Sequence, residues 1–401
     1  MLNAYIYDGV RTAFGKYCGS LAPVRPDDLA AKVIKTLVER NSFQPNLIDD
    51  VVMGCACQSG EDSRNVARYA SLLAGLPVEV SGQTVNRLCG SSLAAIIDTA
   101  RAISCGEGEV YIAGGVESMT RAPLTFNKSA SAYSKDITIY DSAIGVRFPN
   151  SVFGKQYGHA PMPETADNVA KAENISRESC DLLAYNSQQK QAKAAADGFF
   201  EQEIIPVSIP QKRGKPDILV QTDEHPRPGA TLDKMATMQP LFENGVVTAA
   251  NASGINDGTA ALLIGSREFG EQLDRKPLAR ILGGAAAGIE PSMMGLGPVP
   301  ACHKILKRLG MTLDQMDVIE INEAFAAQVL ANLKQLGISE DDPRVNPNGG
   351  AIAIGHPLGA SGARIALTAA RQLQRSGGRY ALISMCVGVG QGIAMIIENA
   401  D

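Results

Sequence analysis

Cys89 stands at a point where the sequence changes from one pattern to another. In TVNRLCGSSLAA (84–95), a β-branched lead-in is followed by Cys89-Gly90 and then by apolar residues at helical spacing. The pattern predicts a strand that turns sharply into a helix, with Cys89 at the turn. A free cysteine is most often a buried packing residue, but here the helix dipole and the first helical N–H groups would lower the thiol pKa. The turn therefore favours Cys89 as a nucleophile, although the G-x-S-x-G elbow of hydrolases is absent.

Two further residues have the chemistry to act with such a nucleophile. His356 is flanked by a glycine and a proline that fix its backbone. A lone histidine is usually structural, but a fixed backbone suits a general base whose direction matters. Cys386, in MCVGVGQG (385–392), ends an expected strand before a glycine-rich turn. It is either a buried strand cysteine or an acid/base, with the N–H of Gly388 as a donor to an oxyanion.

Asn322 is a weaker candidate. It lies in INEAFAAQ (321–328), where an expected strand ends and an expected helix begins. A polar residue in this place is usually a helix cap. The alternative is an amide held in a cleft as a hydrogen-bond donor.

The sequence contains an internal repeat. DDVVMG (49–54) and MDVIEI (316–321) each have an acidic lead-in followed by a buried strand, and Asp50 aligns with Asp317 at an offset of 267 positions. Ala-rich helices recur in the same way, over 91–103 and 361–373. Strands that alternate with helices predict parallel sheets covered on both faces. We therefore predict two α/β halves of one design.

The same offset carries Cys89 onto His356. If the halves are related by a pseudo-twofold axis, these residues occupy matching strand-to-helix turns. Sites in such proteins usually lie where the halves meet. Cys89 and His356 are therefore predicted to face one cleft.

Composition limits the class of protein. The 401 residues carry a net charge of −5, which offers no footprint for nucleic acid or an anionic membrane. The beginning of the chain lacks the pattern of a secretory signal. The eight cysteines are scattered and, like the four histidines, show no zinc-ligand spacing. We expect a cytoplasmic protein without a metal site.

The middle of the chain departs from the repeat. It is rich in proline and contains a charged, helical segment at 176–198. It reads as an inserted loop subdomain that serves as a lid or in substrate recognition. The expected divisions are an N-terminal half at 1–120 completed by about 247–272, a loop subdomain at 121–246, and a C-terminal half at 273–401.

Five motifs together give the chain a family resemblance. NRLCGSSL, NASGINDG, NEAF, NGGAIAIGHPLGASGAR and CVGVGQG, in this order, resemble the thiolases, and the likeness runs from GVRTAFG (9–15) onward. Many thiolases have Cys-x-Gly-Gly-Gly in the last motif, and here Val389 replaces the middle glycine while Gly388 is retained. YGHAPMPETADNVA (157–170) resembles the branch that cleaves 3-oxoadipyl-CoA.

The resemblance implies an α/β fold with α-β-α-β-α layers, two mixed sheets, and a homodimer or a dimer of dimers. It also implies that Cys89 attacks the 3-keto carbon of a 3-oxoacyl-CoA with His356 as base, and that Cys386 protonates the departing enolate. The enolate oxygen would be stabilised by His356 and a water held by Asn322. The tetrahedral intermediate would be stabilised by the N–H groups of Cys89 and Gly388.

Coenzyme A enters as a substrate, and no cofactor is required because the thioester itself acidifies C2. The resemblance implies that CoA lies in the loop subdomain. Ser253 and Ala249 would meet its pantetheine and Arg227 its nucleotide. The acyl tunnel would be walled by Met162, Phe242, Ala324 and Phe325.

A dicarboxylic acyl chain ends in a charge that cannot enter an apolar tunnel unpaired. Arg147, which lies among apolar residues at 139–150, is a candidate partner for that carboxylate, and His159 is a second. An exposed surface role for Arg147 is equally compatible with the sequence.

Three rival functions remain open. A broader 3-ketoacyl-CoA or acetoacetyl-CoA thiolase would share the same motifs. A decarboxylating ketoacyl synthase would share the duplicated fold, but resembling members need a second histidine or an asparagine in place of Cys386. A non-catalytic acyl-CoA or lipid carrier would have no reason to keep Cys89, His356 and Cys386 together.

Overall fold

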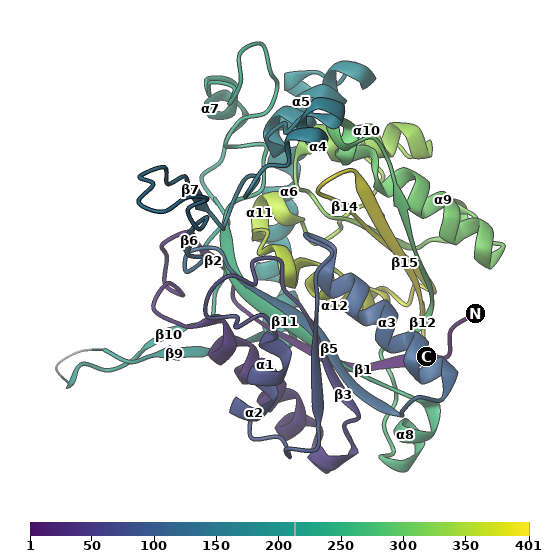
Figure 1. Ribbon diagram of the computed structural model, residues 1–401. Helices are drawn as coiled ribbons and strands as arrows, with labels where there is room; N and C mark the ends of the chain where they lie inside the picture. Colours follow the sequence, from purple (N-terminus) through teal and green to yellow (C-terminus); the bar gives the residue numbers. More distant parts are fainter. Residues whose placement is uncertain (212–213, 401) are drawn as a thin grey trace.

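Figure 1 shows the computed structural model, which describes residues 1–211 and 214–400. Its largest element is a mixed sheet with the strand order β13-β14-β15-β12-β1-β11-β5-β3-β4. These strands are β1 (Ala4–Thr12), β3 (Asp50–Gly54), β4 (Ser81–Val85), β5 (Val110–Ser118), β11 (Asn256–Gly265), β12 (Ala279–Gly288), β13 (Val318–Ile321), β14 (Tyr380–Val387) and β15 (Gln391–Asn399). Two short strands, β2 (Gly15–Lys16) and β8 (Ile204–Ile205), pair with β11 and β1.

The sheet consists of the same arrangement used twice. In the N-terminal half the order is β3-β5-β11-β1, and in the C-terminal half it is β13-β14-β15-β12. In both halves the first pair is parallel and the next two pairs are antiparallel. The predicted duplication is therefore confirmed. The two expected sheets are joined, however, because Ala4 of β1 pairs antiparallel with Ile281 of β12 and makes one continuous sheet.

Helices form the remaining layers. The helices α1 (Pro26–Asn41) and α2 (Val66–Leu73) cover the outer face of the N-terminal half, and α9 (Pro298–Leu309) and α10 (Ala326–Leu336) cover that of the C-terminal half. Between the halves lie α3 (Ser91–Cys105) and α12 (Leu358–Ser376) (Figure 1). The short helices α8 (Arg267–Gln272) and α11 (Ala351–Ile354) and the 3-10 turns at 45–47, 291–296 and 313–315 complete the two halves. The result is the expected five-layer α/β fold.

The central helices pack closely because small residues line their contact. A Cβ atom on Gly362 would lie 2.4 Å from the backbone nitrogen of Leu93, so only glycine fits there. Beside it, the Ala363 N–H donates to the Ser92 hydroxyl over 2.9 Å. The stretch Leu88–Cys105 is long and apolar enough to cross a membrane by length and composition, but 61% of it is buried inside the protein, as in a core helix.

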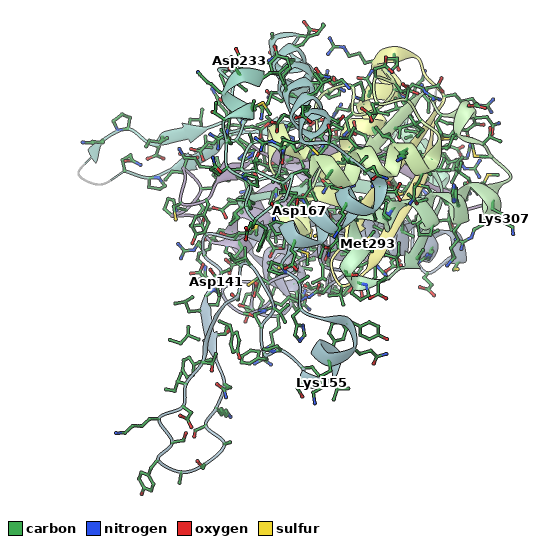
Figure 2. The ribbon with its side chains drawn as sticks, turned by 90° about the horizontal axis from the view of Figure 1, so that it is seen from above. Asp141, Lys155, Asp167, Asp233, Met293 and Lys307 are labelled. Atoms are coloured by element: carbon green, nitrogen blue, oxygen red, sulfur yellow. The ribbon has the colours of Figure 1, made fainter. Side chains whose placement is uncertain are left out.

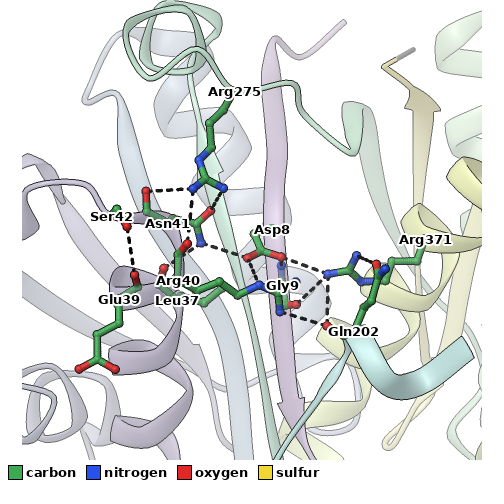
Figure 3. Close-up of polar contacts among 10 residues, drawn as sticks. All are labelled: Asp8, Gly9, Leu37, Glu39, Arg40, Asn41, Ser42, Gln202, Arg275 and Arg371. Atoms are coloured by element: carbon green, nitrogen blue, oxygen red, sulfur yellow. Dashed lines mark hydrogen bonds and ion pairs between the residues drawn. The ribbon is translucent and has the colours of Figure 1, made fainter. Parts of the chain in front are cut away.

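Buried charges also hold the layers together. Asp8 on β1 accepts hydrogen bonds from Asn41 of α1 and from Arg371 of α12, and it pairs with Arg40 (Figure 3). Arg275 donates to the same Asn41 side chain. One carboxylate thus joins the N-terminal sheet to an outer and a central helix.

The inserted segment carries helices and two hairpins that project from the body. Its helices are α4 (Ser151–Tyr157), α5 (Met162–Glu173), α6 (Arg177–Ala196) and α7 (Leu232–Ala236), with a 3-10 turn at 199–202. The hairpins pair β6 (Leu124–Phe126) with β7 (Ile139–Asp141), and β9 (Val207–Ile209) with β10 (Ile218–Val220). Figure 2 shows Asp141 at the base of one projection and Lys155 on another. The domain boundaries given above stay a prediction.

Candidate active site

The turn before α3 places Cys89 two residues ahead of the first helical residue. The preceding Leu88 has φ = 46°, which is a costly backbone conformation for a side chain of its size. The Gly90 N–H donates to the Arg87 carbonyl over 2.9 Å, and the Ser91 N–H donates to that of Leu88 over 3.1 Å. These bonds close a tight turn that presents the half-buried thiol of Cys89.

The expected low thiol pKa is wrong for the free protein. Burial raises the pKa of Cys89 to about 11. The backbone N–H groups of Gly388 and of Cys89 itself favour the thiolate, but they offset only part of the cost of burial. Cys89 is therefore a thiol at neutral pH and needs a base to become a nucleophile.

The matching turn places His356 two residues before α12. It follows Gly355, whose φ of 109° is open to glycine but not to other residues. The His356 N–H donates to Asn256 Oδ1 over 2.9 Å, and the side chain is buried. The predicted equivalence of the Cys89 and His356 turns is therefore confirmed at the level of the helix starts.

Hydrogen bonding fixes the imidazole tautomer. The Ser361 hydroxyl donates its proton to the Pro357 carbonyl over 2.9 Å, so its oxygen accepts from His356 Nδ1 over 2.6 Å. Nδ1 therefore carries the hydrogen and Nε2 has the free lone pair. Burial, with the Arg364 cation as a second cause, lowers the pKa of His356 to about 3. The ring is thus neutral, with a basic nitrogen directed away from Ser361.

Asn322 lies beside this nitrogen rather than at a helix cap. Its Nδ2 is 3.5 Å from His356 Nε2. The helix α10 has Phe325 as its N-cap, so Asn322 precedes the cap by three residues, and the capping interpretation is wrong. Its Oδ1 is buried and has no protein partner among the described residues. The amide is therefore free to orient a further polar group.

Cys386 and Gly388 approach Cys89 from the other half. Gly388 presents its N–H to the Cys89 sulfur, and a Cβ on Gly388 would lie 3.0 Å from Leu88. Burial is the main cause that raises the pKa of the Cys386 thiol, and Cys89 adds to it. A thiol of high pKa is a proton donor at neutral pH. Val389, which replaces the expected glycine, has φ = 62° in the β14–β15 turn and is exposed.

Two family models divide the chain between them. The thiolase N-terminal domain matches residues 4–268, and the thiolase C-terminal domain matches residues 275–399. The chain belongs to the thiolase family. The resemblance inferred from the motifs is thereby confirmed.

Individual relatives cover the whole length. The β-ketoadipyl-CoA thiolase of Acinetobacter baylyi is 56% identical over 401 residues, and the 3-oxoadipyl-CoA/3-oxo-5,6-dehydrosuberyl-CoA thiolase of Escherichia coli K12 is 54% identical, each with 100% of both chains covered. The solved human mitochondrial 3-ketoacyl-CoA thiolase in complex with CoA is 39% identical, with a TM-score of 0.91 over 100% of this chain and 98% of that one.

Some predicted tunnel residues of this thiolase lie together. Ala324 and Phe325 are buried in one cluster with Cys386. The sulfur of Met162 would be 3.9 Å from a Cβ on Gly388. The Ser253 N–H donates to the Ala324 carbonyl over 2.9 Å.

The other predicted binding residues contact segments away from the two thiols. Ala249, Phe242 and Arg227 are exposed, and the Arg227 N–H donates to Gln188 Oε1. Arg147 is half-buried and donates to the Cys57 carbonyl over 3.2 Å. His159 stacks on a phenylalanine and contacts the Asn150 carbonyl over 3.1 Å. Within the described residues, none of the hydrogen bonds or ring contacts of these residues involves Cys89.

Sequence reasoning missed two residues that hold the base. Asn256 lies in a family motif that gives it no role, and Ser361 stands in the sequence only as the first residue of the expected helix at 361–373. A serine five positions after a histidine gives no signal without knowledge of the turn between them. In the described ranges 1–211 and 214–400, no group of three or more His, Cys, Asp or Glu residues could hold a metal ion.

Proposed function

We propose that this thiolase cleaves 3-oxoadipyl-CoA with CoA to succinyl-CoA and acetyl-CoA, a step of aromatic-compound degradation by the β-ketoadipate or phenylacetate route. The observation that carries this proposal is the full-length identity of 54–56% to relatives named for this substrate. Identity to the solved human 3-ketoacyl-CoA thiolase is 39%. A broader chain-length range is the alternative.

In the first half-reaction, His356 Nε2 takes the thiol proton of Cys89 and the sulfur attacks C3 of the substrate. The C2–C3 bond breaks, and its electron pair forms the enolate of acetyl-CoA. The enolate takes a proton at C2 from Cys386, and the succinyl group stays on Cys89 as a thioester. The neutral imidazole, with its hydrogen on Nδ1, and the un-ionised thiol of Cys386 support these roles.

In the second half-reaction, CoA attacks the acyl carbon and Cys89 departs as a thiolate. His356 first passes the proton that it already holds to one of the two thiolates, Cys386 or Cys89. It then takes the proton of the CoA thiol and passes it to the other, so that both thiols are restored. The cycle therefore consumes no proton and requires neither a metal nor a redox cofactor.

Two oxyanions form along this path. The N–H groups of Cys89 and Gly388 already face the Cys89 sulfur, which supports a role in binding the tetrahedral oxyanion. His356 and a water held by Asn322 would bind the enolate oxygen. Each such donor typically lowers the barrier by about 3 kcal/mol.

For the acyl terminus, we assign Arg147 as the partner of the substrate carboxylate, with His159 as the second candidate. One Arg147 Nη atom donates to the 57–59 loop, which leaves the other guanidinium donors for a carboxylate. The experiment compares kcat/KM for 3-oxoadipyl-CoA, acetoacetyl-CoA and 3-oxohexanoyl-CoA. We expect 3-oxoadipyl-CoA to be preferred, and Arg147→Ala to remove the preference while Lys155→Ala, which removes a cation from α4, keeps it.

A wild-type preference for acetoacetyl-CoA or 3-oxohexanoyl-CoA would overturn the substrate assignment. If 3-oxoadipyl-CoA is preferred by both the wild type and Arg147→Ala, the carboxylate has another partner, and His159→Ala is the next test.

Arg227→Ala should raise the KM for CoA and leave kcat unchanged, since uniform binding acts on KM.

We also propose a homodimer or a dimer of dimers in the cytoplasm. The strand β4 forms an outer edge of the sheet, and Tyr69, Leu72 and Leu73 on the adjoining α2 are exposed. An open edge beside apolar side chains is a template for pairing with another chain. The mass in solution, measured by sedimentation, tests the assembly. Eight free cysteines, two of them in the proposed chemistry, fit a reducing compartment.

A further inference from the structure

The internal duplication relates Cys386 to a residue that has no role in the reaction described so far. In the N-terminal half, Ile112 on β5 pairs with Val51 on β3; in the C-terminal half, Ala381 on β14 pairs with Val318 on β13. Five residues further along these two matching strands stand Glu117 and Cys386. Glu117 therefore occupies the place in the N-terminal half that Cys386 occupies in the other.

Both residues reach across to the turn of the opposite half. Cys386 interacts with Cys89, which precedes α3 and adds to the rise in the pKa of the Cys386 thiol. Glu117 Oε2 accepts a hydrogen bond of 2.8 Å from the N–H of Gly359, in the first turn of α12 and three residues after His356. The C-terminal strand places a thiol beside the nucleophile, and the N-terminal strand places a fixed carboxylate against the helix that follows the base.

Glu117 joins three segments. Besides Gly359, its carboxylate accepts the N–H groups of Ala56 and Cys57, each over 3.0 Å, and the residue is 2% exposed. The backbones of α12 and β5 are in close contact here, because a Cβ on Gly359 would lie 2.5 Å from the Val116 carbonyl oxygen. The beginning of α12 is thus held directly against β5 and the loop after β3.

The charge of Glu117 is unusual for such a place. It forms no ion pair within the described residues, and the titratable groups that interact with it include Asp62, Cys55, Cys57 and Cys89. None of these supplies a positive charge. A buried carboxylate without a counter-ion is expensive, and burial accordingly raises the pKa of Glu117 to about 6. Three N–H donors converging on one acceptor group explain why a carboxylate is kept, since an amide would oppose one of them with its own NH₂.

We propose that Glu117 is a positioning residue for the thiolase reaction: it fixes the first turn of α12 against the 55–57 loop and so holds His356 Nε2 in line with Cys89. The inference rests on the proposed role of His356 as the base. It adds no group to the reacting atoms. Its contribution is to keep a neutral imidazole within reach of the thiol proton.

The test compares Glu117→Gln with Asp62→Asn. Asp62 is a buried carboxylate of the same cluster, but it accepts its hydrogen bonds from the Gly60 N–H and the Cys55 thiol, neither of which belongs to α12. Each variant is assayed with the best wild-type 3-oxoacyl-CoA, and kcat is expressed per Cys89 titrated by acylation. His356→Asn serves as the benchmark for losing the base.

We expect Glu117→Gln to lower kcat by roughly 30- to 100-fold with KM changed by less than about threefold, since a displacement of about 1 Å costs on this order. Asp62→Asn should stay within about threefold of the wild type. If Glu117→Gln does not fold, Glu117→Asp keeps the charge but shortens the reach, and its kcat per titrated site should fall in the same direction.

Three results would overturn the inference. In the first, Glu117→Gln has the wild-type kcat per titrated Cys89 and only a smaller titratable fraction. In the second, Asp62→Asn loses as much kcat as Glu117→Gln. In the third, Glu117→Gln changes KM and leaves kcat as in the wild type. Activity retained in His356→Asn would instead refute the assignment of the base. The assay substrate is chosen by measurement, so an error in the substrate assignment leaves this test intact.

Discussion

The turns that carry Cys89 and His356 are equivalent in the duplicated fold, but they hold their side chains in opposite ways. Cys89 is half-buried and follows a residue with a costly positive φ. His356 is buried, with its backbone N–H bonded to Asn256 and its ring to Ser361. One turn presents a reactive atom to a substrate, whereas the other fixes the direction of a lone pair.

The two turns also share one property. Burial raises the pKa of Cys89 and lowers that of His356, so both groups are uncharged at neutral pH. The duplication therefore does not supply a ready-made ion pair. Charge develops only when a substrate carbonyl can receive it between the N–H groups of Cys89 and Gly388, which is where donors have most effect on the barrier.

The largest effect is expected when the nucleophile Cys89 is removed. Cys89→Ala should lower kcat by about 10⁴-fold or more, because neither half-reaction can proceed without the acyl carrier. Cys105→Ala, at the other end of α3 and exposed, should retain full activity. Mass spectrometry after incubation with substrate should find the acyl group on the peptide that contains Cys89. A label on the peptide of Cys386 would reverse the roles of the two thiols.

The next effect separates the nucleophile from the acid. Cys386→Ser should slow carbon–carbon cleavage by roughly 10²- to 10⁴-fold, the range of general acid–base catalysis, because a hydroxyl is a much weaker acid than a thiol. Acyl exchange between Cys89 and CoA should fall by much less. Cys302→Ser, which alters a buried thiol on α9, controls for the packing effect. Equal losses in the two half-reactions would contradict this division of labour.

Much of this arrangement could be predicted from the sequence. The period of the apolar residues gave the helices at 91–103 and 361–373, and the offset of 267 aligned Cys89 with His356 without any coordinates. These features are local or repeated, so the sequence displays them directly. The reactive types, Cys and His, were also visible at their turns.

Contacts between segments were not predictable in this way. The bond of Ser361 to His356 depends on the path of the turn, and that of Glu117 to Gly359 joins residues 242 positions apart. The joining of the sheets at Ala4 and Ile281 is of the same kind. The prediction of a low pKa for the Cys89 thiol was wrong because the sequence shows that a helix begins there but does not show how deeply the thiol is buried. The effect of burial on the pKa outweighs that of the helix N-terminus.

The resting protonation state of Cys89 gives a test of intermediate size. Because its pKa is raised, the thiolate fraction should increase about tenfold per pH unit from pH 7 to 9, with no plateau near pH 8.5, where an ordinary cysteine ionises. The rate of alkylation by iodoacetamide, followed on the peptide of Cys89, measures this fraction in the free enzyme. The exposed Cys18 is an internal reference. An alkylation rate that stays constant from pH 7 to 9 would show that Cys89 rests as a thiolate beside an imidazolium.

The smallest effect concerns the orientation of the base. Ser361→Ala removes the acceptor of His356 Nδ1 but leaves the ring in place, so both tautomers become accessible and only one has its lone pair on Nε2. We expect kcat to fall about tenfold, with KM nearly unchanged, because a positioning bond to a neutral ring contributes on the order of 1 kcal/mol. Ser376→Ala, at the exposed end of α12, is the matched control. A loss as large as that of His356→Asn would mean that Ser361 takes part in proton transfer itself, and no loss would mean that Asn322 alone orients the ring. Either result would change the comparison between the turns. A large loss would make Ser361 part of the proton transfer, and no loss would mean that the Ser361 bond does not orient the base.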